Sequence, residues 1–343
     1  MVTFIVLSRR SFRRGALTVY ILVFALSLTV CELKAEDSPL MPPTADQDRR
    51  ILALSIHVAG HRRLVHYRTW GNPMDPAVLV LHGSLSDSRG YQVLSALALD
   101  GYYVILWDQR GNGLSERITR EEYTEASIVE EIDAIAETFS PGKPVRLVGH
   151  SFGGMFAALY LSERPHRVSH AVFLEPGGLN GEIFSKTYSK IINIDLFDPK
   201  LNSLFWQSEQ IAPQDHETAD YRALMILQNG RQANYHRDPR NPTPWPVWRP
   251  GGWVDVWRQH LLGYNPLKNR FRFDFVRGAA SFPHPVLFIG GTYSALGAAY
   301  QKEYHVPLFP NGASVVEIPE TGHRLVVEDP EGVLQAIREY FRE

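Results

Sequence analysis

The residues whose types and positions best suit catalytic chemistry are a serine between glycines and a histidine near the C-terminus. Residues 149–154 read Gly-His-Ser-Phe-Gly-Gly, which matches the Gly-x-Ser-x-Gly pattern of a nucleophilic serine on a tight turn. An apolar run typical of a buried strand precedes this segment, and a helical pattern follows it. A serine needs a base within hydrogen-bond reach. Among thirteen histidines, His323 follows the last predicted strand, so we interpret Ser151 as the nucleophile and His323 as its base.

The elements that must position these residues alternate along the chain. Two strand-like runs, 52–59 and 64–70, flank Gly60 and predict a hairpin. Six apolar runs suit strands that are buried on both faces of a parallel sheet, at 77–82, 102–107, 145–149, 171–175, 285–290 and 314–318. Helical patterns occur at 128–139, 152–163 and 332–341. The alternation predicts an α/β fold with a doubly wound, mostly parallel sheet of eight strands.

One interval breaks the alternation. Residues 178–282 show no strand–helix rhythm, and they contain five of the seven tryptophans and several prolines. We interpret this interval as an inserted lid. Its aromatic residues either line an apolar or aromatic pocket or form the lid's own small core. The predicted core then consists of 51–177 and 283–343, preceded by a flexible leader at 36–50.

The first 35 residues differ from the rest. A basic segment, an apolar run of 15 residues at 16–30 and a small residue at 35 follow one another, as in a secretory signal peptide. Residues 8–12 read Ser-Arg-Arg-Ser-Phe and resemble a bacterial twin-arginine export signal. We therefore expect a periplasmic or secreted protein without stable membrane insertion after signal removal. An uncleaved N-terminal anchor is the alternative, although the run is short for a span of about 20 residues.

Composition and motifs argue against several classes of function. The formal net charge is −2 and no basic run occurs after the signal, so a nucleic-acid partner has no electrostatic support. No metal-binding pattern and no phosphate-binding glycine loop occurs. Cys31 is the only cysteine, and it lies inside the signal. We expect no metal and no cofactor, while the oligomeric state stays open.

Four features together give the chain a resemblance to the α/β-hydrolase superfamily, from about residue 51 onward. They are the serine turn, His82-Gly83 after the third predicted strand, His323 after the last one, and a loop at 108–113 similar to that of lidded members such as proline iminopeptidases. The resemblance implies that a small ester or amide is cleaved through an acyl-enzyme. It also implies an oxyanion hole formed by the N–H groups of Ser84 and Phe152. An acyltransferase with the same triad and a non-catalytic ligand-binding protein on this fold are the alternatives.

The triad acid is where the chain departs from the superfamily pattern. In most members the acid follows the strand before the histidine strand, but here Ser294 holds that place, and no acid occurs from 285 until Glu303. Glu175 ends the strand after the nucleophile's, where some members, including certain dehalogenases, carry their acid. The carboxyl ends of such strands face the active site. We therefore predict that Glu175 accepts a hydrogen bond from Nδ1 of His323; the alternative is a glutamate that caps the lid entrance.

Other polar residues near the motifs have structural interpretations. We expect Asp108 and Arg110 to organise their loop, and His82 and His150 to brace backbone and not to transfer protons. Iminopeptidase activity would further require lid carboxylates that hold a free amine. The candidates for that role are Glu182, Glu209, Glu217 and Asp220.

Overall fold

The computed structural model describes residues 40–191, 214–229, 237–238, 241, 243–268 and 270–342. The predicted signal peptide, together with Trp206 and Glu209 of the predicted lid, lies outside the described residues. The elements below all belong to the unit Met41–Glu343.

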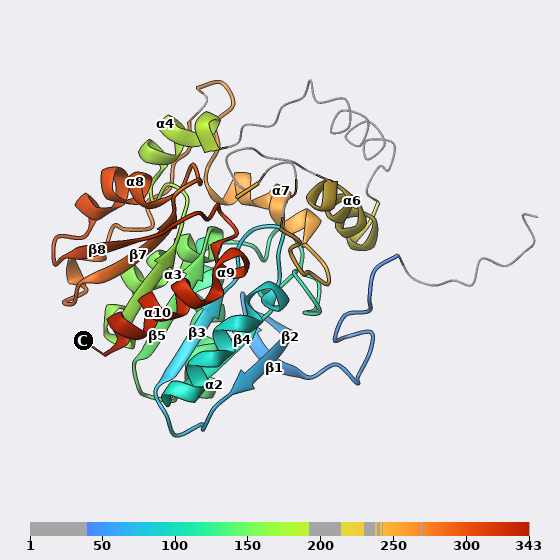
Figure 1. Ribbon diagram of the computed structural model, residues 1–343. Coiled ribbons are helices and arrows are strands. Elements are labelled where there is room, and N and C mark those ends of the chain that lie inside the picture. Colours follow the sequence, from blue (N-terminus) through green and yellow to red (C-terminus); the bar gives the residue numbers. More distant parts are fainter. Residues whose placement is uncertain are drawn as a thin grey trace, which may run out of the picture. The chain divides into compact units, whose positions relative to one another are not determined.

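Eight strands form one sheet in the order β1-β2-β4-β3-β5-β6-β7-β8 (Figure 1). Their bounds are β1 (Ala53–Val58), β2 (His61–Trp70), β3 (Ala77–Leu81), β4 (Tyr103–Trp107), β5 (Val145–His150), β6 (Val168–Leu174), β7 (Val286–Gly291) and β8 (Ala313–Ile318). The pairs β1–β2 and β2–β4 are antiparallel, and the other pairs are parallel. The predicted hairpin and the mostly parallel eight-stranded sheet are confirmed.

Helices cover both faces of this sheet. One face carries α2 (Glu125–Phe139) and α3 (Phe152–Glu163), and the other carries η1 (Ser88–Asp100), α9 (Leu325–Glu328) and α10 (Pro330–Phe341). Side chains of one strand alternate between the two cores; in β3, Leu79 and Leu81 point to the first, and Val78 and Val80 to the second. Burial on both faces explains why these strands are continuous apolar runs in the sequence.

A long segment between β6 and β7 carries α4 (Gly181–Ile191), α6 (His216–Asn229), α7 (Gly252–Leu261) and the short η3 (Ala279–Ser281). In Figure 1, α4, α6 and α7 lie in the upper part of the view, away from α2 and α10, and α6 packs against α7. The remaining short elements are η2 (Pro165–Arg167), α8 (Ala298–Tyr300), the π-helical turn η4 (Gln301–His305) and η5 (Val306–Leu308). None of the helices in the described ranges is both long and apolar enough to span a bilayer.

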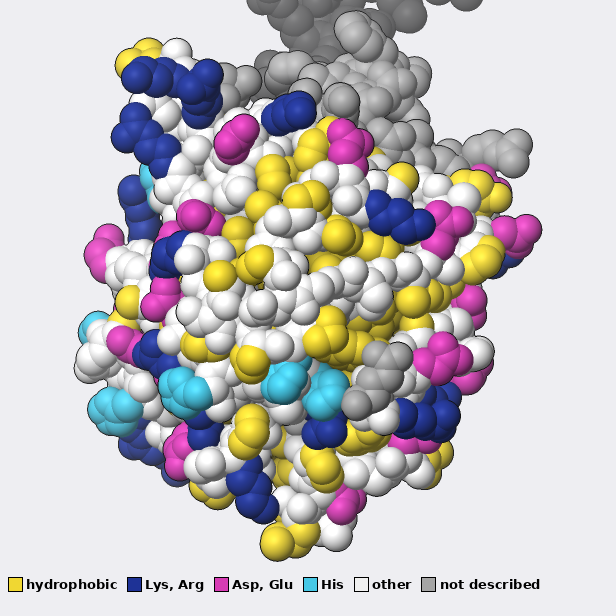
Figure 2. Space-filling model, turned by 90° about the vertical axis from the view of Figure 1, so that its left-hand side faces the viewer, with side chains coloured by type: hydrophobic (Ala, Val, Ile, Leu, Met, Phe, Trp, Pro, Cys, Tyr) yellow, Lys and Arg dark blue, Asp and Glu magenta, His cyan; other side chains and the backbone are white. Residues whose placement is uncertain are grey.

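Charged side chains of both signs are mixed on the face that Figure 2 shows. Several basic side chains lie along one margin of that face, and others lie among acidic and hydrophobic side chains over the remainder. A mixed surface of this kind is what the nearly balanced composition leads one to expect.

Candidate active site

Ser151 occupies a strained turn between β5 and α3. Its backbone has φ 54° and ψ −121°, a conformation that non-glycine residues seldom adopt. The Ser151 N–H donates to the carbonyl of Leu174 at 2.9 Å, which ties the turn to the end of β6. A Cβ on Gly149 would collide with the backbone of Gly153, so glycine is required there. The structure thus contains the strand–turn–helix context that the sequence predicts for this serine.

Glu175 follows β6 directly and is fully buried. Its Oε2 lies 2.6 Å from Nδ1 of His323, and its Oε1 accepts the N–H of Gly291 at 2.6 Å. The hydroxyl of Ser294 donates to the same Oε2 at 2.6 Å. Ser294, which stands where the superfamily acid is expected, therefore supports a carboxylate that comes from the neighbouring strand.

Burial shifts the pKa values of this pair in opposite directions. It raises the pKa of the Glu175 carboxyl, while the hydrogen bonds from Ser294 and Gly291 lower it. Burial lowers the pKa of His323, and the nearby charge of Arg324 adds to that effect. The three donors around Glu175 favour its carboxylate form. A neutral His323 that donates its Nδ1–H to this carboxylate keeps the lone pair of Nε2 for a proton.

His150 connects the turn that contains Ser151 to the loop that carries His323. Its Nε2 donates to the backbone carbonyl of His323 at 2.8 Å, and its Nδ1 accepts the hydroxyl of Tyr91 at 2.7 Å. Tyr91 in turn accepts the N–H of Gly83 at 3.0 Å. The two imidazole rings lie 4.6 Å apart, and burial lowers the pKa of His150 to about 3. These contacts support the structural interpretation of His150, which remains neutral and fixes the backbone around His323.

The loop after β3 passes close to the serine. A Cβ on Gly83 would lie 3.1 Å from Cβ of Ser151. Within the described part of the chain, the N–H groups of Ser84 and Phe152 have no hydrogen-bond acceptor, whereas that of Gly83 is taken by Tyr91. Two backbone donors therefore remain beside Ser151, at the residues that the sequence resemblance assigns to an oxyanion hole.

The neighbouring loops are organised by the polar residues that the sequence singled out. His82 accepts the N–H of Gln109 through Nε2 at 3.0 Å and lies 2.9 Å from the Gly83 carbonyl through Nδ1. Asp108 accepts the backbone N–H of Ser88, at the start of η1, and that of Leu114, which follows its own loop. Arg110 pairs with Glu131 of α2 at 2.9 Å. These contacts hold the loop that follows β3 and the loop that follows β4 in place.

The segment between β6 and β7 also contacts the site. The ring of Trp245 stacks on His150 with centroids 5.8 Å apart, and its Nε1 donates to Ser86 at 2.9 Å. From α7, Asp255 accepts the hydroxyl of Ser84 at 2.7 Å. Sequence reasoning missed Asp255, because no periodicity or motif marks this residue.

The four carboxylates considered for an amine-binding role have different surroundings. Asp220 is fully buried, where it accepts Arg249 at 2.7 Å and the N–H of Gly252 at 2.8 Å. Glu182 is exposed at the start of α4, Glu217 lies in the first turn of α6, and Glu209 lies outside the described residues. The Asp220 carboxylate is therefore paired with Arg249 and, at 3.4 Å, with Arg117.

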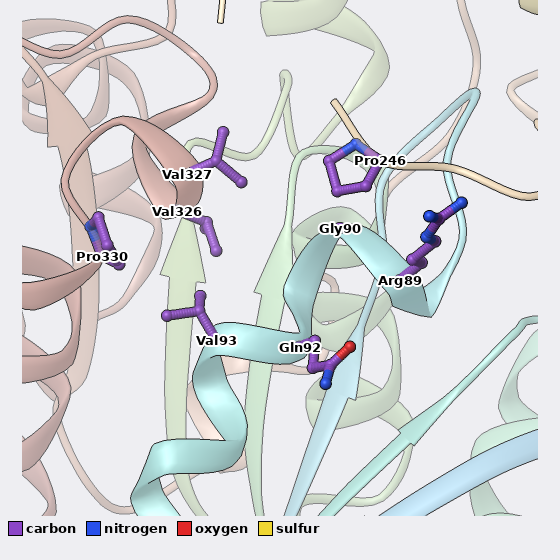
Figure 3. Close-up of a pocket in the computed structure, with 8 residues that line it drawn as sticks. All are labelled: Arg89, Gly90, Gln92, Val93, Pro246, Val326, Val327 and Pro330. Atoms are coloured by element: carbon purple, nitrogen blue, oxygen red, sulfur yellow. The ribbon is translucent and has the colours of Figure 1, made fainter. Parts of the chain in front are cut away.

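A pocket of about 390 Å³ lies between η1, Pro246 and the region of α9 (Figure 3). Its walls come from η1, from the residue after Trp245 and from the region of α9, and its lining is Arg89, Gly90, Gln92, Val93, Pro246, Val326, Val327 and Pro330. None of these eight residues is one of the candidate catalytic residues Ser151, His323 and Glu175. Among the residues that the structure describes, no group of three or more His, Cys, Asp or Glu side chains is placed to hold a metal ion.

Comparison of the sequence with known protein families shows which family the chain belongs to. Residues 76–330 match the family described as alpha/beta hydrolase fold, and the chain therefore belongs to the α/β-hydrolase family. A proline iminopeptidase, PfmaB of Pestalotiopsis fici, is 34% identical over 110 residues, which cover 31% of this chain and 38% of that protein. The proline iminopeptidase of Lactobacillus helveticus is 30% identical over 163 residues, which cover 46% of this chain and 49% of that protein. The chain thus matches less than half the length of either relative.

Solved structures show the same fold at lower sequence identity. VinJ superimposes with a TM-score of 0.60 at 18% identity, covering 88% of this chain and 99% of that one. A thermophilic esterase from Thermogutta terrifontis superimposes with a TM-score of 0.58 at 18% identity, covering 85% of this chain and 98% of that one. Likeness at this level of identity establishes the fold alone.

Proposed function

We propose that the protein is a serine hydrolase that cleaves an ester or amide bond of a small, apolar or aromatic substrate through an acyl-enzyme. The observation that carries the proposal is the buried hydrogen bond between Glu175 and Nδ1 of His323, formed beside a serine on a strained turn. A carboxylate in this position holds the imidazole in the tautomer that accepts a proton at Nε2.

The reaction follows from the positions of these groups. Ser151 Oγ attacks the carbonyl carbon, and its proton passes to Nε2 of His323. The N–H groups of Ser84 and Phe152 bind the oxyanion, and each such donor stabilises the transition state by about 3 kcal/mol. Collapse of the intermediate expels the leaving group, which takes the proton from His323. Water then attacks the acyl-enzyme and gives its proton to His323. The second intermediate releases the acid as His323 returns this proton to Ser151 Oγ.

The surroundings of two acidic side chains, Asp220 and Asp255, favour a substrate without a free amine. The partial matches to proline iminopeptidases suggest cleavage after an N-terminal residue, which requires carboxylates that hold an ammonium group. Asp220 is bound by Arg249, and Asp255 already accepts Ser84 and Arg258. We therefore place acyl esters ahead of aminoacyl amides as substrates.

A panel of substrates tests this proposal. Aryl esters of increasing acyl length and aminoacyl arylamides would be offered to the wild-type protein and to Ser151→Ala. We expect turnover of at least one ester and its loss in the variant. If an alcohol or amine is added and most of the product is then the acylated alcohol or amine, the protein is an acyltransferase. A folded wild-type protein without turnover and without acylation would favour the ligand-binding alternative.

We also propose that residues 1–35 direct export. The basis is the order of basic, apolar and small residues and the paired Arg9 and Arg10. A reporter fused after residue 40 should reach the periplasm of a bacterial host. Its export should stop when both arginines are changed to lysine, and unchanged export would contradict the twin-arginine assignment.

A further inference from the structure

Helix α7 of the inserted segment reaches the residues of the proposed oxyanion hole. The hydroxyl of Ser84 donates to Oδ1 of Asp255 at 2.7 Å, across 171 residues of sequence. Asp255 lies in the first turn of α7. Because a carboxylate forms strong hydrogen bonds with a hydroxyl, this contact fixes the rotamer of Ser84 and restrains the peptide that carries its N–H.

Arg258 extends this contact to the second residue of the hole. Its Nη1 donates to the same Oδ1 of Asp255 at 2.8 Å, and its guanidinium carbon lies 5.0 Å from the ring centroid of Phe152. The side chain of Arg258 is only 3% exposed, so its attraction to the ring acts in a largely desolvated setting. One ion pair on one helical turn therefore touches both Ser84 and Phe152.

The position of α7 is set by contacts other than this pair. The N–H of Gly252 donates to the buried carboxylate of Asp220, which also binds Arg249. Val254 is buried and packs so closely on Gly111 that a Cβ on that glycine would lie 2.6 Å from it. The helix is thus anchored to α6 and to the loop after β4, and it presents Asp255 and Arg258 to the site from there.

We propose that Asp255 and Arg258 are positioning residues that hold the oxyanion hole in its active geometry, so that docking of α7 on the core controls the rate of acyl transfer. This proposal rests on the proposed serine hydrolase function. The backbone donors of Ser84 and Phe152 stabilise an oxyanion only when both N–H groups are aimed at the position that the oxygen will occupy. The ion pair of Asp255 and Arg258 orients these two N–H groups from outside the hydrolase core, without contacting the reacting atoms.

The test compares graded changes at both positions on a small aryl ester. Asp255→Asn keeps an acceptor for Ser84 but loses the charge opposite Arg258, and Asp255→Ala loses both. We expect kcat to fall about tenfold in the first and about a hundredfold in the second, with little change in KM, as for weakened oxyanion stabilisation. Arg258→Lys should retain more activity than Arg258→Met. Affinity for a boronic acid that forms a tetrahedral adduct with Ser151 should fall in parallel with kcat/KM.

A double-mutant cycle separates positioning from simple stabilisation of the helix. If Asp255 acts through the hydroxyl of Ser84, Asp255→Ala should cost less activity in the Ser84→Ala background than in the wild-type protein. Asp274→Asn is the matched control, because Asp274 is an exposed carboxylate that accepts the nearby N–H of Val276 at 3.0 Å. We expect this control to retain wild-type kcat.

Two outcomes would overturn the proposal and remain distinguishable from each other. If the Asp255 and Arg258 variants fold and keep wild-type kcat and boronate affinity while Ser151→Ala is inactive, the pair has no positioning role and the serine mechanism stands. If Ser151→Ala keeps its turnover, the serine mechanism fails and the positioning role fails with it. In the first of these outcomes, a lower thermal unfolding midpoint of the variants would assign the pair to stability alone.

Discussion

Two polar contacts lie at this site, and they are built in different ways. The hydrogen bond between Glu175 and His323 is buried, whereas in the ion pair of Asp255 with Arg258 the Asp255 side chain is 37% exposed. Glu175 and His323 come from loops that follow β6 and β8, so the parallel sheet itself sets their separation. Asp255 and Arg258 lie one turn apart on α7, and they reach the site only because that helix docks on the core. The comparison suggests a division of labour, in which the sheet supplies the chemistry and the inserted segment adjusts it.

The largest effect should come from the contact that the sheet builds. Glu175→Gln removes the charge that stabilises the imidazolium, and we expect kcat to fall by roughly three to four orders of magnitude with the fold intact. Steady-state kinetics with an aryl ester, beside circular dichroism, would measure this. Glu163→Gln is the matched control, because Glu163 pairs with Arg277 at the surface.

Position 294 offers an internal check on that result. Ser294 already donates to Glu175, so an aspartate at position 294 would lie close to the place that the Glu175 carboxylate occupies. Adding Ser294→Asp to Glu175→Gln should restore part of the lost turnover. Near-normal activity of Glu175→Gln alone would remove Glu175 from the mechanism.

The sheet-built contact was predictable from the sequence, and the helix-built one was not. Glu175 and His323 each follow a predicted strand, and the carboxyl ends of parallel strands meet at one edge of a sheet, so their proximity follows from the pattern. Asp255 and Arg258 form an i, i+3 pair of a kind that is common on solvated helix faces. Their partners lie far away in sequence, and only the docking of α7 brings them together.

Two further features show what the sequence patterns miss and what they predict. The helical segment η1 was not predicted, although Tyr91, Leu94 and Leu97 recur at a spacing of three and are buried against the sheet. The role of Tyr91, which joins Gly83 to His150, depends on that missed element. The element bounds of the strands, by contrast, agree with the predicted runs to within a few residues, because burial on both faces leaves a continuous apolar signal.

The pH dependence should separate the two contacts. Protonated His323 cannot accept the serine proton, so kcat/KM must fall as the pH drops through the pKa of this residue. Burial lowers that pKa, and we expect the acid limb to lie below the ordinary histidine value of about 6.5. Asp255→Asn should lower the plateau without moving the limb. An acid limb above 6.5 in the wild-type profile would contradict this view of His323.

The smallest effects should arise from the tryptophans of the inserted segment. Trp245→Ala removes the ring that stacks on His150, and we expect the preference among acyl chain lengths to change several-fold, as pocket contacts do elsewhere. Trp253 instead donates to the carbonyl of Asp215 and stacks near Trp257. Trp253→Ala should therefore lower thermal stability and leave the preference unchanged. Equal loss on all substrates in Trp245→Ala would mean that this ring only holds the segment in place.

The central claim is that Ser151 is an activated nucleophile, and its labelling by a fluorophosphonate tests this most directly. Intact-mass and peptide mass spectrometry should find one adduct per chain, located on Ser151. The adduct should be absent in Ser151→Ala and should form much more slowly in Glu175→Gln. A folded wild-type protein that stays unlabelled, or a label that persists in Ser151→Ala, would contradict the account.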